Sequence, residues 1–475
     1  MNALPAFPYD FAVIGGGSAG YAAASTAARL GLKTVVIEGG REIGGLCILR
    51  GCMPSKTLIE SANRFRMLRH AGEFGLWADG ISFDGGKIIA RKKALISEFA
   101  DYRREQLESG RFEFVRGCAS FLDANTLEVK GGEPRIIRAR AFLVATGSRV
   151  QPVAVPGLAE TGFLDSDAVL DSTHVPRSVI LLGGGATALE FAHYYEGLGS
   201  QVAIVQRSAQ FLREMDADVA AALVSGFERR GIRMFFGTKL LRAERADEGK
   251  RIVFEQDSLE KSVEAEEIIC ALGRVPQLER LGLETAGVTV ENGQLTVNAH
   301  QQTNSKHIFA AGDAAGPFEI VHIAIQQGEV AARNAAKLLG SGLEPLERTD
   351  YRLKLSVVFC EPQIASVGAT EKELAAAGKP FRTARYPFKD HGKSLVMGET
   401  DGFVKLIAAA DSREILGAAL VGPQASDLIH EIVVAMHFHA TARDLARIPH
   451  YHPTLSEIWT YPAEELAEIL VCPSS

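Results

Sequence analysis

Short apolar runs alternate with segments whose apolar residues recur at helical spacing, starting close to the N-terminus. The run DFAVI (10–14) predicts a strand, and the Ala-rich stretch YAAASTAARLG (21–31) predicts a helix. Between them lies the glycine turn GGGSAG (15–20), and the next apolar run, KTVVIE, ends on Glu38. A strand, a glycine turn, a helix and a second strand together predict a nucleotide-binding βαβ unit.

The same pattern returns 168 residues later (183 − 15). An apolar strand, 179–182, runs into the turn GGGATA (183–188), a helical stretch, LEFAHYYEGLG, and a second strand, QVAIVQ (201–206). This internal duplication predicts two dinucleotide-binding domains of the Rossmann type.

The remaining segments complete the predicted fold. Residues 57–110 have helical spacing and predict one or two surface helices, whose Phe65, Phe99 and Tyr102 we expect in the core. Residues 111–150 and 265–277 predict strands, and from about residue 350 two strand-rich segments, 356–368 and 401–422, have the character of a β-meander, with helical stretches after them. The predicted fold class is α/β, with two Rossmann-like domains and a C-terminal α+β domain.

Composition and charge narrow the function classes. The net charge of −7 (51 − 58) over 475 residues argues against a nucleic-acid partner, which needs a basic face. No apolar run approaches the length of a membrane span, and the N-terminus lacks the basic region of a signal peptide, so we expect no membrane partner. The six cysteines do not form a disulfide framework, which favours a cytoplasmic protein with one special cysteine pair. They lie at positions 47, 52, 118, 270, 360 and 472.

The first glycine turn has the residues of a dinucleotide site. Gly15, Gly17 and Gly20 permit a tight turn and close approach of the backbone, and the N-terminus of the following helix can receive a pyrophosphate. Glu38, at the end of the second strand, can accept a hydrogen bond from a ribose hydroxyl. The alternative is a glycine-rich turn that binds nothing.

The second turn differs from the first in two ways. Its third glycine position is Ala188, and its second strand ends on Gln206 and Arg207 instead of a carboxylate. An acid there would repel a 2′-phosphate, whereas Arg207 and Arg213 can clamp one, so this site should prefer NADPH to NADH. The alternative is that both arginines are solvated surface charges.

The stretch GGLCILRGCMPSK (44–56) carries a closely spaced cysteine pair, Cys47 and Cys52. Closely spaced cysteines in an intracellular protein indicate redox or metal chemistry. A disulfide between them requires a distorted turn, which Gly51 permits. A zinc site is disfavoured, because no second Cys or His pair completes four ligands. The remaining alternative is two small buried hydrophobic residues.

Two further candidates lie in the C-terminal half. Asp313, after a strand and a glycine, suits a contact to a hydroxyl of a cofactor tail, or it caps the next helix. Near the end, Pro453 is expected to be the first helical residue, so that Glu457 reaches back to His452. A carboxylate on one ring nitrogen makes the other a better base, which predicts a catalytic His452.

With these motifs in this order, the chain resembles the flavoprotein disulfide reductases, also called pyridine nucleotide–disulfide oxidoreductases. Dihydrolipoamide dehydrogenase, glutathione reductase and mercuric reductase belong to that family. The resemblance extends from Asp10 to about Glu464 and includes the Cys-x4-Cys-x-Pro-Ser-Lys motif, the ATG turn at 145–147 and the final His-Pro-Thr-x-Ser-Glu. It implies FAD in the first nucleotide site, NADPH in the second, and a homodimer that acts on a disulfide substrate.

The resemblance also implies roles for particular residues. Cys52 would lie against the flavin as the charge-transfer thiolate, Cys47 would attack the substrate, and Lys56 would pair with Glu190 near the flavin. His452 and Glu457 would serve the cysteine pair of the other subunit. The residues implied in cofactor binding are Gly15, Gly17, Gly20, Glu38, Gly44, Gly45, Lys56, Thr146, Gly147, Gly183, Gly185, Arg207, Arg213, Gly273, Arg274, Gly312 and Asp313.

The implied domains are an FAD-binding domain (1–150 and 278–349), an NAD(P)H-binding domain (151–277) and a dimerisation domain (350–475). The expected activity is that of a dihydrolipoamide-dehydrogenase-like enzyme driven by NADPH. The alternatives are a metal-ion reductase of the mercuric-reductase type and a flavin-level quinone reductase or transhydrogenase. Against the metal-ion alternative, known mercuric reductases carry Tyr where this chain has His452, and Cys472 has no second Cys beside it.

Overall fold

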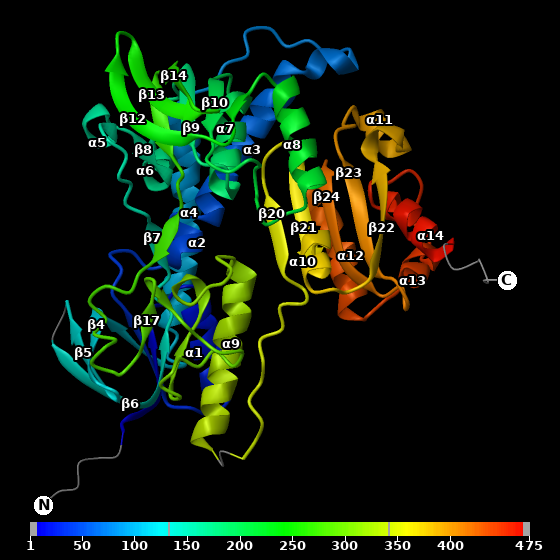
Figure 1. Ribbon diagram of the computed structural model, residues 1–475. Helices are drawn as coiled ribbons and strands as arrows, with labels where there is room; N and C mark the ends of the chain where they lie inside the picture. The colour runs from blue at the N-terminus through cyan, green and yellow to red at the C-terminus, as the bar shows by residue number, and fades with distance from the viewer. Residues whose placement is uncertain (1–6, 132–133, 341–342, 469–475) are drawn as a thin grey trace, which may run out of the picture. The chain divides into compact units, whose positions relative to one another are not determined.

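The computed structural model describes residues 7–131, 134–340 and 343–468 (Figure 1). Cys472 lies outside the described residues. The chain divides into two compact units, which are described separately. The first comprises Met1–Thr57, Lys87–Pro152 and Gly273–Asp350, and the second comprises Leu58–Gly86, Val153–Leu272 and Tyr351–Ser475. The predicted division into three domains at residues 150, 277 and 349 stays a prediction.

The first unit is built on a mainly parallel sheet. Its strands lie in the order β3-β2-β1-β6, with β19 also paired to β6, and an antiparallel extension adds β5 and β4. The parallel strands end at one edge, where the glycine turn follows β1. The bounds are β1 Tyr9–Ile14, β2 Thr34–Glu38, β3 Glu113–Arg116, β4 Cys118–Asp123, β5 Thr126–Lys130, β6 Arg135–Val144 and β19 Ile308–Ala310.

Alanine-rich helices cover this sheet. Helix α1 (Ser18–Arg29) packs along α9 (Val321–Leu339), and the two lie side by side in Figure 1. Their contact is lined by alanines such as Ala23, Ala27 and Ala331, whose short side chains let the helix backbones approach closely. Two further helices, α2 (Gly45–Leu49) and α4 (Gly85–Leu107), precede β3.

The second unit repeats the parallel arrangement. Its sheet has the order β11-β10-β9-β15-β8, all in parallel, and the helices α7 and α8 follow β9 and β10. The predicted duplication is therefore confirmed at the level of topology. The bounds are β8 Leu164–Asp165, β9 Ser178–Leu182, α7 Ala186–Gly197, β10 Gln201–Val205, α8 Ala217–Arg229, β11 Arg233–Phe235 and β15 Glu267–Cys270. A meander of β12 (Lys239–Ala246), β13 (Gly249–Gln256) and β14 (Leu259–Ala265) precedes β15.

The C-terminal part of the second unit is an antiparallel sheet with helices, but it is not a simple meander, because β24 pairs with β21 as well as with β23. Its order is β20-β21-β24-β23-β22, and its core contains Phe388, Ile432 and Trp459. The strands are β20 Leu355–Val358, β21 Gln363–Gly368, β22 Phe381–Pro387, β23 Phe403–Ala409 and β24 Ile415–Gly422. The helices are α10 Glu371–Ala376, α11 Gly392–Met397, α12 Ala425–His437, α13 Ala442–Arg447 and α14 Thr460–Glu468.

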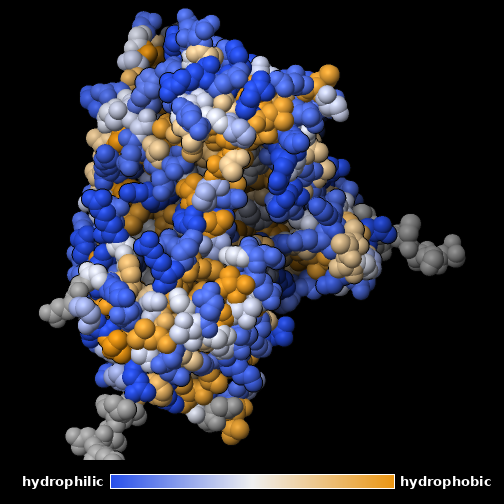
Figure 2. Space-filling model, turned by 60° about the vertical axis from the view of Figure 1, so that its left-hand side comes forward, coloured by the Kyte–Doolittle hydropathy of each residue, from blue (hydrophilic) through white to orange (hydrophobic). Residues whose placement is uncertain are grey.

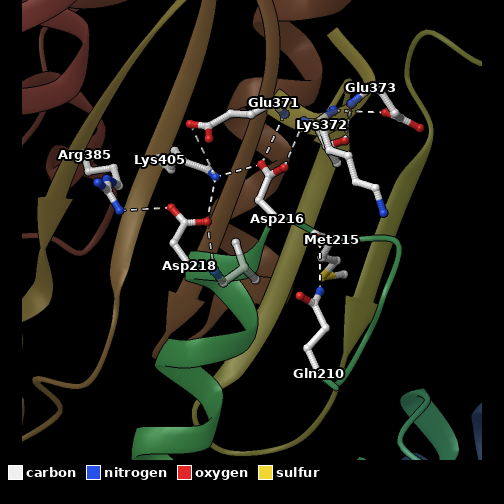
Figure 3. A network of polar contacts seen from close by, with 11 residues as sticks. Gln210, Met215, Asp216, Asp218, Glu371, Lys372, Glu373, Arg385 and Lys405 are labelled. Atoms are coloured by element: carbon white, nitrogen blue, oxygen red, sulfur yellow. Dashed lines mark hydrogen bonds and ion pairs between the residues drawn. The ribbon is translucent and has the colours of Figure 1, made fainter. Parts of the chain in front are cut away.

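A fully buried lysine ties the start of α8 to this antiparallel sheet (Figure 3). Lys405, on β23, places its Nζ 2.7 Å from Asp216 Oδ2 and 2.9 Å from Asp218 Oδ1. Glu371 lies 3.7 Å from the same nitrogen, and the backbone amides of Glu371 and Lys372 donate to Asp216. A buried ammonium needs such compensation, because leaving water is costly for an unpaired charge.

The surface carries several large apolar side chains. On the face in Figure 2, hydrophobic residues are interspersed with hydrophilic ones. Phe99 and Tyr102, expected in the core, are exposed, so that part of the prediction is wrong; Phe65 packs edge-to-face on Phe83. Aromatic character alone does not determine burial, because much protein surface is apolar. Among the described residues, none of the helices combines the length and the apolar character needed to cross a lipid bilayer.

Candidate functional site

The first glycine turn packs as the sequence predicts. Gly15 adopts φ +107°, and a Cβ there would lie 2.3 Å from the carbonyl oxygen of Ala145; a Cβ on Gly20 would lie 1.8 Å from the carbonyl oxygen of Gly15. Gly17 begins α1 without a side-chain cap, and the first turn of this helix has no acidic residue. The free amides at this end therefore suit an anionic group.

Glu38 lies beside this turn. Its Oε2 accepts a hydrogen bond from the amide of Gly16 at 2.8 Å, and its Oε1 accepts from the amide of Gly40 at 2.6 Å. Each carboxylate oxygen has a second lone pair. Glu38 is thus fixed in place and can still accept from the hydroxyls of a ribose.

The cysteine pair lies at a break between two helices. Cys47 is within α2, and Cys52 is the first residue of α3 (Cys52–Arg69). A Cβ on Gly51 would come 3.0 Å from the carbonyl oxygen of Leu46, which supports the prediction that glycine permits this close turn. A Cβ on Gly45 would lie 2.6 Å from the Cα of Gly17, so the start of α2 packs directly on the first glycine turn.

The two thiols interact directly. Cys47 and Cys52 are both in the thiol form and share a hydrogen bond. This hydrogen bond and burial raise the pKa of the Cys47 thiol, whereas the positive charge of Lys56 acts in the opposite direction. The Cys47 thiol is therefore held in its protonated form by its contact with Cys52 and by burial.

Arg50, between the two cysteines, is already paired. Its Nη2 lies 2.9 Å from Glu42 Oε2, and its Nη1 donates to the carbonyl of Leu49. The carboxylate of Glu42 therefore offsets the positive charge of Arg50 beside the two cysteines.

A second polar cluster of the first unit surrounds Asp313. Ser148 Oγ donates to Asp313 Oδ2 at 2.6 Å, and Arg274 donates through Nε to the same hydroxyl at 2.9 Å and through Nη2 to the Ser148 carbonyl at 3.0 Å. Gly312, at φ +68°, donates its amide to Gln327 Oε1. Burial, then the charge of Asp313, raises the pKa of the neighbouring Glu319.

The neighbouring ATG turn is open on one side. Gly147 adopts φ +70°, and a Cβ there would have no atom within 4 Å, while Gly273 adopts φ +115°. The Thr146 hydroxyl donates to the carbonyl of Gln277 at 2.7 Å, so it braces the turn. Sequence reasoning identified Asp313 and Arg274 but missed Ser148, although it directly follows the turn.

The second glycine turn copies the packing of the first. A Cβ on Gly183 (φ +120°) would lie 2.4 Å from the carbonyl oxygen of Ala271, while Gly185 has open space around it. Gly185 begins α7 without a side-chain cap or an acidic residue in the first turn. The amides of this helix end therefore also suit an anionic group.

The loop that follows β10 folds over this second turn. The amide of Leu212 donates to the carbonyl of Gly184, and a Cβ on Gly184 would strike the side chains of Gln206 and Phe211. Arg207 and Arg213 are exposed on this loop, and Arg213 Nε lies 2.9 Å from the exposed Glu214. Both arginines thus lie exposed on the loop that covers the second glycine turn.

Glu190 occupies a buried position on α7. Its Oε1 accepts a hydrogen bond from the backbone amide of Phe359 at 3.1 Å. Its pairing with Lys56 stays a prediction.

The predicted contact between His452 and Glu457 is confirmed. His452 Nδ1 lies 2.9 Å from Glu457 Oε2; the histidine side chain is 76% exposed, whereas that of Glu457 is 11% exposed. The prediction that Pro453 begins the helix is wrong, because the first helical turn, η4, spans Ser456–Trp459. Residues 451–454 instead form a turn in which the Thr454 hydroxyl donates to the carbonyl of Tyr451.

A second histidine, which sequence reasoning missed, faces the same carboxylate. His391 Nε2 lies 3.4 Å from Glu457 Oε1. No sequence signal pointed to it, since it precedes His452 by 61 residues (452 − 391) and belongs to no motif.

The donor sets fit two dinucleotides. Each glycine turn combines an uncapped helix N-terminus with a glycine, Gly17 or Gly185, whose missing side chain leaves room for a phosphate. Only the first turn has an acidic partner for a ribose, Glu38. The residues present therefore fit FAD at the first turn and a pyridine nucleotide at the second.

Comparison with known families gives the same class. Residues 9–328 match the pyridine nucleotide–disulphide oxidoreductase family, and residues 355–463 match the dimerisation domain of the same family. The chain belongs to the pyridine nucleotide–disulphide oxidoreductases, a family of FAD-binding enzymes. The dimerisation domain supports a homodimer.

Among curated proteins, the chain is similar to dihydrolipoyl dehydrogenases. The chain is 35% identical to a dihydrolipoyl dehydrogenase of Chlamydia muridarum over 96% of both chains. It is 34% identical to a dihydrolipoyl dehydrogenase of Bacillus subtilis, over 94% of this chain and 96% of the relative.

Solved structures share the fold. LpdA from Mycobacterium tuberculosis superimposes with a TM-score of 0.86 at 29% identity, covering 96% of this chain and 99% of that one. The HOCl-induced flavoprotein disulfide reductase RclA from Escherichia coli has a TM-score of 0.83 at 24% identity, with coverage of 96% and 99%, which shows the fold alone.

Proposed function

We propose that this flavoprotein transfers electrons between NADPH and a disulfide of the lipoamide type, through FAD and the Cys47–Cys52 pair. The observation that carries the proposal is the hydrogen bond between the two thiols, at a helix break that packs on the first glycine turn through Gly45 and Gly17. The dihydrolipoyl dehydrogenases among its relatives support lipoamide as the acceptor.

The first unit would hold FAD. The free amides of α1 would bind its pyrophosphate, Glu38 would accept from its ribose, and Asp313, fixed by Ser148, would accept from a hydroxyl of its tail. Bound FAD supplies a two-electron carrier that can exchange a hydride with a nicotinamide and electrons with a disulfide.

The cysteines then carry out two exchange steps. The Cys47 thiolate attacks one sulfur of the substrate disulfide, and this breaks the substrate S–S bond, forms a mixed disulfide and releases one thiol. Cys52, as thiolate, attacks the Cys47 sulfur and releases the second thiol. The substrate gains two electrons and two protons, and the cysteines are left oxidised as a disulfide.

His452 would act as the general base and general acid in these two steps. Glu457 accepts from Nδ1, which fixes the tautomer with a lone pair on Nε2. Nε2 can take the proton of the attacking thiol and return it to the leaving thiolate. In the proposed homodimer, His452 acts on the partner subunit's Cys47, so a separated subunit would lack its base.

NADPH rather than NADH is proposed for the second site. The support is the absence of an acid at the end of β10, where Gln206 and Arg207 stand, together with the exposed guanidinium of Arg213. The pairing of Lys56 with Glu190 near the flavin, the three-domain division and a cytoplasmic location are part of the same proposal.

The metal-ion and quinone alternatives have less support. The curated relatives named above are dihydrolipoyl dehydrogenases, and His452, held by Glu457, suits thiol chemistry. No contact in the described residues favours a metal ion over a disulfide.

The test is a matrix of two donors and two acceptors. The purified, flavin-loaded protein is assayed with NADPH or NADH as donor and with lipoamide or glutathione disulfide as acceptor. We expect fastest turnover with NADPH and lipoamide. Absence of turnover with either disulfide, in a protein whose flavin NADPH still reduces, would contradict the proposal.

A matched variant isolates the cysteines. Cys47→Ser should abolish lipoamide reduction, because a serine oxygen cannot form the mixed disulfide with the substrate. Its reduction of an artificial dye, which takes electrons at the flavin, should stay close to wild type. Undiminished lipoamide turnover in this variant would exclude the proposed mechanism.

A further inference from the structure

The carboxylate of Glu457 is shared between two histidines. Its Oε2 lies 2.9 Å from Nδ1 of His452, and its Oε1 lies 3.4 Å from Nε2 of His391. Glu457 itself is mostly buried and belongs to η4, whose neighbours Ile458 and Trp459 are in the core. The backbone of Glu457 is therefore anchored, and its side-chain orientation depends on the two imidazoles.

His391 is held from its other side. It lies between η3 (Phe388–Asp390) and α11, its side chain has no exposed surface, and its Nδ1 is 2.9 Å from the hydroxyl of Ser394, which is also buried. The ring edge meets Tyr461 at 6.4 Å between ring centres. The hydroxyl of Ser394 therefore holds the ring on the side away from Glu457.

The surroundings determine the tautomer of His391. A proton on Nε2 lets the ring face the carboxylate with a donor, while Nδ1 accepts from the Ser394 hydroxyl. The opposite tautomer would direct a lone pair at a carboxylate oxygen, which is repulsive. Burial lowers the pKa of His391, with Glu457 opposing and His452 adding to this shift, so the ring is neutral near pH 7.

We propose that His391 is a positioning residue for the thiol–disulfide reaction: its Nε2–H holds Glu457 in the orientation that accepts from His452 Nδ1. This inference rests on the proposed role of His452 as the base. At 3.4 Å from Oε1, the buried Nε2 of His391 does not have the geometry of a hydrogen bond, so it acts as an electrostatic guide on one oxygen while His452 binds the other. Without it, the carboxylate can rotate away from His452.

Two consequences follow for His452. Its tautomer is less well fixed when Glu457 can turn, so fewer molecules present the Nε2 lone pair to a thiol. In addition, the carboxylate loses its neighbour at Oε1, so its electrostatic interaction with the ring of His452 changes. The titratable groups that act on His391 are Glu457, which opposes the lowering of its pKa, and His452, which adds to it.

The experiment measures the exchange between dihydrolipoamide and NAD(P)+ in the flavin-loaded dimer of His391→Leu. We expect kcat to fall about tenfold, on the order of the loss seen when an outer partner of a functional histidine is removed, with a shifted pH profile. Dye reduction by NADPH, which needs no base at the disulfide, should be unchanged. His391→Gln keeps a donor of similar reach and should recover most of the activity.

A double-variant cycle tests whether His391 acts through Glu457. In a Glu457→Gln background, adding His391→Leu should cause no further loss, because the residue through which it acts is already changed. Losses that multiply in the double variant, an equal loss of dye reduction, or wild-type activity and pH profile in His391→Leu would each overturn the inference.

Ser394→Ala keeps the test decisive if His391→Leu does not fold. This variant retains the imidazole but removes the group on Nδ1, so we expect a smaller loss of kcat in the same direction, absent in the Glu457→Gln background. No loss would overturn the inference. His452→Gln separates this inference from the proposed function. If His452→Gln leaves disulfide exchange intact, the assignment of His452 as the base fails. If His452→Gln strongly lowers the exchange but His391→Leu does not, only the role of His391 is rejected.

Discussion

At the scale of single residues, the two glycine turns differ mainly in what ends the second strand. Glu38 accepts two backbone amides at the first turn, whereas Arg207 stands exposed at the second. This difference supports the proposal that a carboxylate accepts from the ribose of one cofactor, while guanidinium groups bind the 2′-phosphate of the other.

The arginine assignment gives a prediction on nucleotide choice. Arg207→Ala and Arg213→Ala should each raise KM for NADPH about tenfold or more, since a hydrogen bond to a charged group contributes about 1.5–3 kcal/mol. KM for NADH should change little, because NADH has no 2′-phosphate. The measurement is steady-state kinetics with both nucleotides, and Arg245→Ala, an exposed arginine on β12, is the matched control. Parallel losses with NADPH and NADH would contradict the clamp.

Residue-scale prediction from sequence worked where spacing along one segment fixes geometry. The glycine turns, Glu38 and the pair of His452 with Glu457 are local in sequence and were identified. His391 and Ser148 were missed, because each reaches its partner through folding of distant segments. The start of the helix after Pro453 was misplaced because the Thr454 hydroxyl stabilises an intervening turn.

At the scale of helices and strands, the spacing of apolar residues and the order of the segments along the chain predicted the fold well. Strand, glycine turn and helix recur at β1–α1 and β9–α7 with the same close packing of a glycine on a neighbouring strand's end. The pattern could not predict how α8 is joined to the antiparallel sheet. That junction depends on the buried Lys405. Its burial could not be predicted from the sequence, because lysine is normally exposed.

Lys405 gives a prediction on stability. Lys405→Met should lower the free energy of unfolding by about 3–5 kcal/mol, because the buried carboxylate of Asp216 would be left without its cation, and Asp218 would keep only Arg385. The measurement is the denaturation midpoint of the flavin-loaded protein. Arg385→Met is the control, since this half-exposed arginine pairs with Asp218 near solvent and should cost about 1 kcal/mol or less. If the two variants lowered the denaturation midpoint equally, the ion pairs of Lys405 would not be the stabilising feature proposed here.

At the scale of the whole molecule, pH links stability to a buried histidine. His193 Nε2 donates to Asn63 Oδ1 at 2.6 Å, and Nδ1 accepts from Arg230 at 3.0 Å, so both nitrogens of the neutral ring are satisfied. Burial, then the charges of Arg230 and Arg66, lowers the pKa of His193 far below its usual value. Protonation would also remove the acceptor that Arg230 uses.

The sign of the pH effect follows from this shift. Below about pH 6.5 the unfolded chain binds a proton at His193 that the folded chain does not, so the stability present above this pH falls as the pH is lowered. The slope from this one group reaches about 1.4 kcal/mol per pH unit. His193→Gln should therefore lose less thermal stability than wild type between about pH 7 and pH 5. Exposed His70→Gln is the control; identical slopes for all three proteins would contradict the assignment.

The central claim is that Cys47 and Cys52 form a redox pair that exchanges electrons with the flavin. Anaerobic titration with dithionite measures it most directly, by counting electrons taken up per subunit. Wild type should take up about four, because a flavin and a disulfide each accept two, and Cys47→Ser should take up about two. Uptake of about two electrons by wild type, with both cysteines already present as thiols after oxidation in air, would contradict the account.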